Sequence, residues 1–262
     1  METKIKIITC NIRSADADDG ENNWKFRKNI TLEIIKSTNS DIICFQEMTK
    51  VQYDFFSSEL NEFSCLAPLE APGNSNPANS IFFRTDRFFI VSSGSYWLSK
   101  TPYVAGTKSW GCQFPRMVNW GRFKIEDKEF RIINTHLSHV SKTARLKETQ
   151  MILNDVAVYT EKYPQILTGD FNCNSKSKPI SLVLRSGLQD TYSTVHRVLE
   201  PETTIHNFLG QKTPNVEGKI DWIFTKGEIT TLDSNIVKNS INEKYPSDHY
   251  FLTADVVIWG KN

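Results

Sequence analysis

Several short segments of the sequence place a residue that can bind a metal ion or a phosphate directly after an apolar run. They lie at residues 9–13, 45–47, 134–137, 168–172, 219–222 and 247–249. Their polar members are Asn11, Glu47, His136, Asp170, Asn172, Asp221, Asp248 and His249. Each alone has an ordinary explanation, such as an Asx turn, a solvated strand end or a core histidine. A carboxylate in the apolar run around residue 221 is harder to explain, because a buried charge is costly without a partner.

Taken together, these residue types meet the needs of phosphoester hydrolysis. A hard cation such as Mg²⁺ neutralises charge on the phosphoryl oxygens and prefers carboxylate ligands, which Glu47 and Asp248 can supply. A base must deprotonate the attacking water, and a histidine held by a carboxylate is the usual solution. His249 with Asp221 forms such a pair in this hypothesis.

The remaining polar members can contact the phosphate without adding negative charge. The amide groups of Asn11 and Asn172 can hold a phosphoryl oxygen or the attacking water, and His136 can donate a hydrogen bond to the phosphate. The set therefore predicts a metal-dependent phosphoester hydrolase rather than a collection of unrelated turns.

Strands and helices alternate along the chain in two halves that must position these groups. Short apolar or alternating runs predict strands at residues 4–12, 41–45, 81–83, 88–91, 117–125, 130–134, 166–168, 219–224 and 250–258. Amphipathic spacing predicts helices at residues 24–40, 51–60, 141–163 and 179–185. Residues 70–79 and 99–115 are predicted to be loops. This pattern favours two sheets packed face to face with helices outside, in one domain over residues 1–262.

The charge balance disfavours a protein that coats nucleic acid through a general basic excess. The chain has 31 basic and 30 acidic residues, for a formal net charge of +1. Tight non-specific binding to phosphates would therefore need a local basic patch. The basic segment Lys176-Ser177-Lys178 is interpreted as a solvated loop.

The cysteine content and the hydropathy favour a cytoplasmic protein. The five cysteines are odd in number and lack CxxC spacing, which is typical of reduced thiols. The sequence shows no apolar leader at its start and no run of membrane-spanning length. We expect a monomer without an obligate protein partner.

The order of the motifs resembles that of the endonuclease/exonuclease/phosphatase family, the deoxyribonuclease I-like metal-dependent phosphohydrolases. The resemblance rests on Phe45-Gln46-Glu47, on Thr168-Gly169-Asp170-Phe171-Asn172 and on Ser247-Asp248-His249, in this order. It implies an α/β fold, a four-layered sandwich of two mainly antiparallel sheets flanked by helices. It also implies a cofactor, Mg²⁺ or Mn²⁺.

The resemblance also implies roles at the metal. Glu47 would be the principal ligand, assisted by Asp248 and Asn11. Asp170 and Asn172 would orient the nucleophilic water or bind a second metal, since the family is argued to use either one or two ions.

The same resemblance assigns the histidines. His249, paired with Asp221, would serve acid–base or phosphate-stabilising chemistry, and His136 would contact the scissile phosphate.

Arg13, Arg116 and Trp110 are predicted to bind substrate. Arg13 stands where abasic-site repair enzymes resembling this chain carry a carboxylate, which disfavours that activity. Arg116 can clamp a phosphate through its planar guanidinium, or it can be a solvated residue at a strand end. Trp110 can stack on a base, or it can anchor its loop on the core.

Three functional hypotheses remain open from the sequence. The leading one is a nuclease or phosphodiesterase acting on nucleic acid or nucleotide ends, favoured by the tryptophans and Arg13. The second is a phosphatase or phospholipase-like hydrolase of small phosphorylated molecules, such as an inositol phosphate or a phospholipid head group, favoured by the near-neutral charge. A catalytically dead binding module ranks last, because the metal carboxylates and the terminal histidine are all present.

Overall fold

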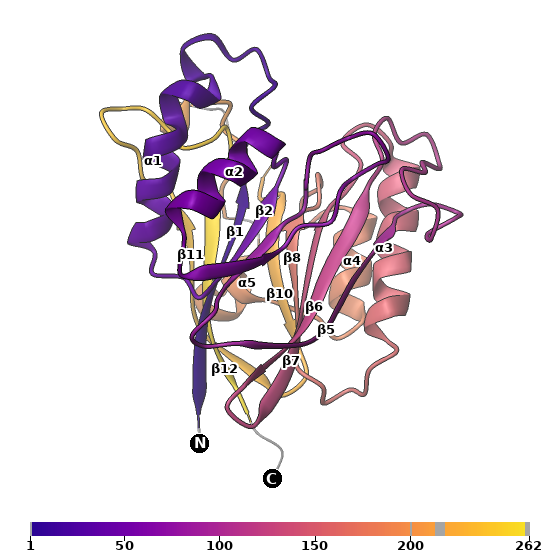
Figure 1. Cartoon of the computed structure of the whole chain (residues 1–262). Coiled ribbons are helices and arrows are strands. Elements are labelled where there is room, and N and C mark those ends of the chain that lie inside the picture. Colours follow the sequence, from indigo (N-terminus) through magenta and orange to yellow (C-terminus); the bar gives the residue numbers. More distant parts are fainter. Residues whose placement is uncertain (1, 200, 213–217, 260–262) are drawn as a thin grey trace.

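Two six-stranded sheets pack face to face in the computed structural model, which describes residues 2–199, 201–212 and 218–259 (Figure 1). The first sheet has the order β11 (Ile229–Val237), β12 (Phe251–Ile258), β1 (Thr3–Asn11), β2 (Ile42–Gln46), β4 (Ile81–Arg84) and β3 (Phe63–Leu66). The second has the order β5 (Phe89–Trp97), β6 (Met117–Ile125), β7 (Lys128–His136), β8 (Gln165–Asp170), β10 (Asp221–Lys226) and β9 (Gln189–Asp190). Within the described residues, β1–β2 and β7–β8 are parallel pairs and the other neighbours are antiparallel.

Helices cover the outer face of each sheet, which completes four layers. On the first sheet, α1 (Trp24–Ser37) and α2 (Lys50–Glu59) pack through Trp24, Ile34 and Phe56. On the second sheet, α3 (Lys142–Val156) and α4 (Lys178–Arg185) pack through Ile152 and Val183 (Figure 1). The short helices η1 (Gly20–Asn22), α5 (Thr191–His196) and η2 (Gly210–Lys212) lie in connections. The predicted four-layered sandwich is therefore confirmed, whereas the assignment of residues 1–262 to a single domain stays a prediction.

The apolar core between the sheets is built from alternating strand residues. Ile5 and Ile7 of β1 face Phe130 and Ile132 of β7 within one buried cluster. Because side chains alternate across a strand, the residues between them point to the outer layers and meet the helices. The period-two pattern of the sequence thus decides which face of each strand enters the core.

Side-chain caps explain where the main helices begin. Thr49 and Gln52 form a reciprocal capping box at the start of α2, and Ser141 accepts a hydrogen bond from the Ala144 amide at the start of α3. Ser177 caps α4 in the same way, with Pro179 in the first turn. Within the described residues, no helix is long and apolar enough to cross a membrane.

Several predicted elements differ from the structure. The helix predicted over residues 141–163 ends at Val156, because the chain leaves the sheet there and exposes Val158 before turning into β8. Strands β3, β9 and β11 and helix α5 were not predicted. In β11 a bulge between Thr231 and Asp233 interrupts the alternation, and a polar edge strand gives a weak sequence signal.

A buried polar network joins the two sheets beneath the site described below. Gln46, the last residue of β2, donates from Nε2 to Asn134 Oδ1 of β7 at 2.7 Å and to Thr9 Oγ1 of β1 at 3.0 Å. Asn134 donates in turn to the Phe45 carbonyl at 2.8 Å. Hydrogen bonds between fully buried amides fix the relative position of the strands, because any slip leaves a buried donor unpaired.

Candidate active site

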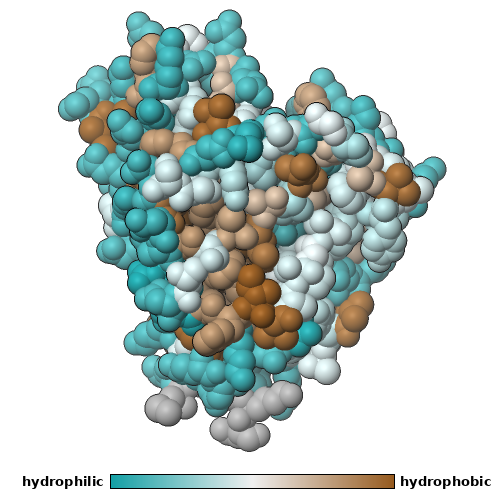
Figure 2. Space-filling model, in the orientation of Figure 1, coloured by the Kyte–Doolittle hydropathy of each residue, from teal (hydrophilic) through white to brown (hydrophobic). Residues whose placement is uncertain are grey.

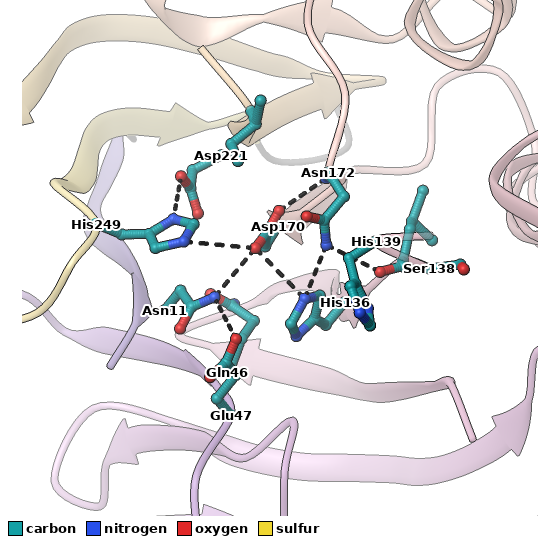
Figure 3. Close-up of polar contacts among 12 residues, drawn as sticks. Asn11, Gln46, Glu47, His136, Ser138, His139, Asp170, Asn172, Asp221 and His249 are labelled. Carbon is teal, nitrogen blue, oxygen red and sulfur yellow. Dashed lines mark hydrogen bonds and ion pairs between the residues drawn. The ribbon is translucent and has the colours of Figure 1, made fainter. Parts of the chain in front are cut away.

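The strand ends that carry the sequence motifs meet at one end of the sandwich (Figure 3). Asn11, His136 and Asp170 are the last residues of β1, β7 and β8, and Glu47 directly follows β2. The parallel pairs β1–β2 and β7–β8 bring these carboxyl ends to the same edge. Their antiparallel neighbours begin at that edge, which places Asp221 at the start of β10 and residues 248–249 just before β12.

Asp170 lies at the centre of the site and is almost completely buried. Its Oδ2 accepts a hydrogen bond from Asn11 Nδ2 at 3.0 Å and lies 3.4 Å from His136 Nε2 and 4.0 Å from His249 Nε2. Its Oδ1 accepts the Asn172 backbone amide at 2.7 Å. Burial and the nearby Asp221 carboxylate raise the pKa of Asp170 to about 7. A carboxylate with such a pKa can exchange a proton near neutral pH.

His249 and Asp221 form a buried hydrogen-bonded pair. His249 Nδ1 lies 2.9 Å from Asp221 Oδ2. Burial opposes protonation of the imidazole, but the Asp221 carboxylate outweighs it and the pKa of His249 lies well above its ordinary value. Because Asp221 engages Nδ1, Nε2 is the ring nitrogen directed toward Asp170 (Figure 3).

Glu47 faces this pair from the end of β2. Its Oε1 accepts from Asn11 Nδ2 at 3.1 Å and its Oε2 accepts the Ser14 backbone amide at 3.0 Å. Burial opposes its ionisation, but the hydrogen bond from Asn11 and the charge of His249 outweigh burial, so the pKa of Glu47 is lowered. The backbone of Glu47 has φ 62°, and such strained residues cluster at functional sites.

His136 and Asn172 form the other side of the site. His136 Nε2 lies 2.9 Å from Asn172 Nδ2, and the same amide donates to the Leu137 carbonyl at 3.0 Å. Burial and the positive charge of Arg116 lower the pKa of His136 well below its ordinary value. The imidazole is therefore neutral, and the turn after β7 is held to the turn after β8.

Two groups of residues have the chemistry to hold a cation. Ligand atoms of Asp170, Asp221 and His249 lie within 4.8 Å of one another, a possible metal site. Asp221 Oδ1 in that cluster is buried and has no hydrogen-bond partner among the described residues, so its lone pairs are available. Glu47 and Asp248 form the second group, and both line the cavity as oxygen donors. Oxygen donors of this kind fit a hard divalent cation.

A cavity of about 470 Å³ opens over these groups. Its lining residues are Arg13, Ser14, Glu47, Met48, Thr49, Glu70, Asn76, Ala78, Phe114, Arg116, His136, His139, Asp170, Asn172, Ile205, Asn207, Asp248 and His249. Figure 2 shows the surface hollowed between the lobe that carries α1 and the lobe that carries α3, at this end of the sheets. The cavity gives a ligand direct access to both groups of carboxylates.

Comparison with known proteins agrees with this geometry. Residues 8–249 match the model of the Endonuclease/Exonuclease/phosphatase family. The chain belongs to this family. It is accordingly a phosphoester hydrolase by family, with a buried Asp/His cluster at the strand ends.

Individual family members differ in substrate. The endonuclease/exonuclease/phosphatase from Bacteroides vulgatus is 28% identical with a TM-score of 0.88, covering 97% of this chain and 98% of that one. The Bacteroides thetaiotaomicron mannosyl-6-phosphatase Bt3783 is 25% identical with a TM-score of 0.84, covering 97% and 100%. The CCR4-Not complex 3'-5'-exoribonuclease subunit Ccr4 of Aspergillus niger is 21% identical over 91% of this chain and 48% of its own length. The chain spans about half the length of such curated relatives.

The structure brings two of the three predicted substrate-binding residues to the family's cavity. Arg13 lines it, but its guanidinium is held by Asp19 at 2.9 Å and lies 3.8 Å from Asp248. Arg116 also lines it, with Nη2 3.3 Å from His139 Nδ1 and a buried Nε that has no partner among the described residues. Trp110 is not among the described residues that line the cavity, and its carbonyl accepts the Ser141 hydroxyl at 2.7 Å.

Other cavity residues were missed by sequence reasoning. His139 and Phe114 stack with ring centroids 5.6 Å apart, and Glu70 and Asn76 approach from the opposite loop. His139 follows the His136 motif by only three residues, so its proximity was a usable signal. Phe114, Glu70 and Asn76 lie in the two segments predicted to be loops, whose spacing carries no information about where they point.

Proposed function

We propose that the chain is a divalent-metal-dependent phosphodiesterase that acts on nucleic acid or on nucleotide ends. The observation that carries the choice of substrate is an exposed aromatic wall beside a cation. Phe114 is 49% exposed, its ring stacks on His139, and Arg116 contacts the same histidine. An exposed ring beside a phosphate-binding guanidinium is suited to a base that stacks while its phosphate is clamped.

Glu47 and Asp248 are the proposed cation ligands, with Asn11 positioning Glu47, and Mg²⁺ or Mn²⁺ fits their oxygens. When bound, the cation neutralises charge that develops on the phosphoryl oxygens. The Asp170, Asp221 and His249 cluster is the alternative place for a cation. The hydrogen bond between His249 and Asp221 favours the Glu47 side, because a cation at the cluster would compete with that bond.

The remaining residues bind and orient the reacting groups in this proposal. Asp170 is held by Asn11 and by the Asn172 amide, and it faces the cavity, where it can orient the attacking water. His249 presents Nε2 to the same space and can donate to a phosphoryl oxygen. His136 and Asn172 approach the scissile phosphate from the opposite side.

A phosphatase of small phosphorylated molecules is the second candidate. It is supported by the likeness to the mannosyl-6-phosphatase, which extends over 97% of this chain and the whole of that one. The formal net charge of +1 is consistent with it, since such a substrate does not need an extended basic surface.

A hydrolysis panel with and without EDTA tests the proposal. It includes single- and double-stranded DNA, RNA with a poly(A) tail, a cyclic phosphate, an inositol phosphate, mannose 6-phosphate and sphingomyelin. We expect cleavage of a polynucleotide that EDTA abolishes. Glu47→Gln should lower turnover and raise the Mg²⁺ concentration for half-maximal activity, because one ligand charge is lost.

Glu70→Gln is the matched control, since Glu70 lines the same cavity outside the proposed ligands. It should leave the Mg²⁺ requirement unchanged. Turnover of only the small phosphomonoesters would contradict the nuclease proposal and support the phosphatase. Equal Mg²⁺ requirements in both variants would contradict Glu47 as a ligand.

A further inference from the structure

A second cavity adjoins the candidate active site and has a different character. Its volume is about 630 Å³, and it lies between the starts of α3 and α4 and the loop that follows β8. Asn172 lines both this cavity and the one over Asp170. A ligand that fills the active site can therefore extend past Asn172 into the second cavity.

Cations dominate the lining of this second cavity. Lys142, Arg145, Lys176 and Lys178 line it, and the described residues around it include no Asp or Glu. In the described part of the chain, no ion pair joins any of the three lysines to a carboxylate. This basic cavity, defined by its four cations, concentrates positive charge in a chain whose formal net charge is only +1.

The position of two of these lysines runs against helix electrostatics. Lys142 and Lys178 are the first residues of α3 and α4, and neither helix has an acidic residue in its first turn. A helix N-terminus carries partial positive charge, so a lysine there is less favourable than an acidic residue. Local conflicts of this kind are expected at functional sites, and here both helix ends and both lysines attract an anion into one cavity.

Arg145 links the basic cavity to the active-site wall. It lies on α3, is half-buried, and donates from Nη1 to the Ser138 carbonyl at 2.7 Å. Ser138 lies in the turn between His136 and His139, which line the active-site cavity. The guanidinium is thereby held in place between the two cavities, and a preorganised donor loses little entropy when a ligand binds.

We propose that the basic cavity binds a second phosphate of the substrate, next to the phosphate that is cleaved at the Asp170–His249 centre. This inference rests on the proposed function and narrows its substrate to a nucleic-acid strand, in which phosphates follow one another at regular spacing. The segment Lys176-Ser177-Lys178, interpreted from the sequence as a solvated loop, becomes part of this subsite. It is the local basic patch that the charge balance of the chain otherwise lacks.

The test compares substrates with one and with several phosphates. We would measure kcat/KM for a dinucleotide with a single phosphodiester, for a single-stranded decanucleotide, and for an inositol polyphosphate. The variants are the double substitution Lys142→Gln and Lys178→Gln, and a control, Lys147→Gln with Lys36→Gln. Lys147 is exposed on α3 but does not line the basic cavity, and Lys36 is exposed on α1. Binding of the decanucleotide in EDTA is measured separately as a function of salt.

The cavity variant should reduce kcat/KM for the decanucleotide about tenfold and leave the dinucleotide unchanged, because only the longer strand reaches the cavity. The slope of log affinity against log salt should fall in magnitude by about 1 for each lost phosphate contact. The control should match the wild type. Equal kcat/KM and equal salt slopes in both double variants would overturn the subsite, even if the chain hydrolyses nucleic acid.

Two outcomes separate this inference from the proposed function. If the wild type cleaves no nucleic acid but binds the decanucleotide with a salt slope that the cavity variant loses, the subsite stands and the proposed activity fails. If only the inositol polyphosphate depends on the lysines, the second phosphate comes from a small molecule, and the assignment to a nucleic-acid strand is overturned.

Discussion

Asp170 and Asp221 lie directly opposite each other on the antiparallel strands β8 and β10, although both carboxylates are buried. Two buried carboxylates in this arrangement repel each other, and Asp221 contributes to the raised pKa of Asp170. The imidazole of His249 contacts both, at 2.9 Å from Asp221 and 4.0 Å from Asp170. The histidine therefore holds together a pair of charges that burial alone would not tolerate.

Asp221→Asn should separate the catalytic from the structural role of this pair. The asparagine cannot stabilise a protonated His249, so we expect turnover to fall by about 10²–10⁴-fold. The melting temperature should stay constant or rise, because the repulsion with Asp170 is removed. Turnover and thermal unfolding are measured together, with Asp255→Asn at the partly exposed Lys6 pair as the control. Wild-type turnover in Asp221→Asn would contradict the role of the pair.

Asn11→Asp should make the stability of the chain depend on a divalent cation. The Asn11 amide donates to Glu47 and to Asp170, and a carboxylate there would bring three negative charges together. We expect a lower melting temperature than the wild type in EDTA and a larger rise on adding Mg²⁺, since a bound cation offsets the repulsion. Asn11→Ala removes the amide without adding charge. An equal Mg²⁺ response in both variants would argue against a cation beside residue 11.

Phe114 and Trp110 can be ranked as stacking residues by their alanine variants. Phe114 lines the cavity, whereas Trp110 is not among its described lining residues. Phe114→Ala should raise KM for an oligonucleotide by at least about fivefold, since stacking on one base contributes about 1–3 kcal/mol. Trp110→Ala should change KM by less than about twofold. The reverse ranking would restore the base-stacking prediction for Trp110.

Glu148→Gln should change how stability depends on pH. Glu148 is buried on α3, its Oε2 accepts the Ser138 amide at 2.9 Å, and burial raises its pKa. A carboxyl whose folded pKa is raised stabilises the fold below its unfolded pKa, and this contribution is lost as pH rises through the folded pKa. The amide variant lacks this dependence.

Urea unfolding at several pH values measures the effect. The free energy of unfolding of Glu148→Gln minus that of the wild type should increase from about pH 4 to about pH 8. A constant difference across this range would show that Glu148 has the same pKa in the folded and unfolded chains.

Residue types and motif order were enough to predict the family, the four-layered sandwich and most of its strands. Strand signals are local, because a short apolar run ends at a polar residue regardless of what the rest of the chain does. For this reason Asn11, Glu47, His136 and Asp170 could be placed at strand ends before any contact between them was known.

Contacts between distant segments appear only in the folded chain. The stacking of Phe114 on His139 depends on how a loop without regular periodicity folds over the sheet. The basic cavity depends on two helix starts, at Lys142 and Lys178, that are brought together by packing of α3 and α4 on one sheet. Sequence spacing encodes periodicity within an element, whereas the distance between elements is set by the packing of many side chains at once.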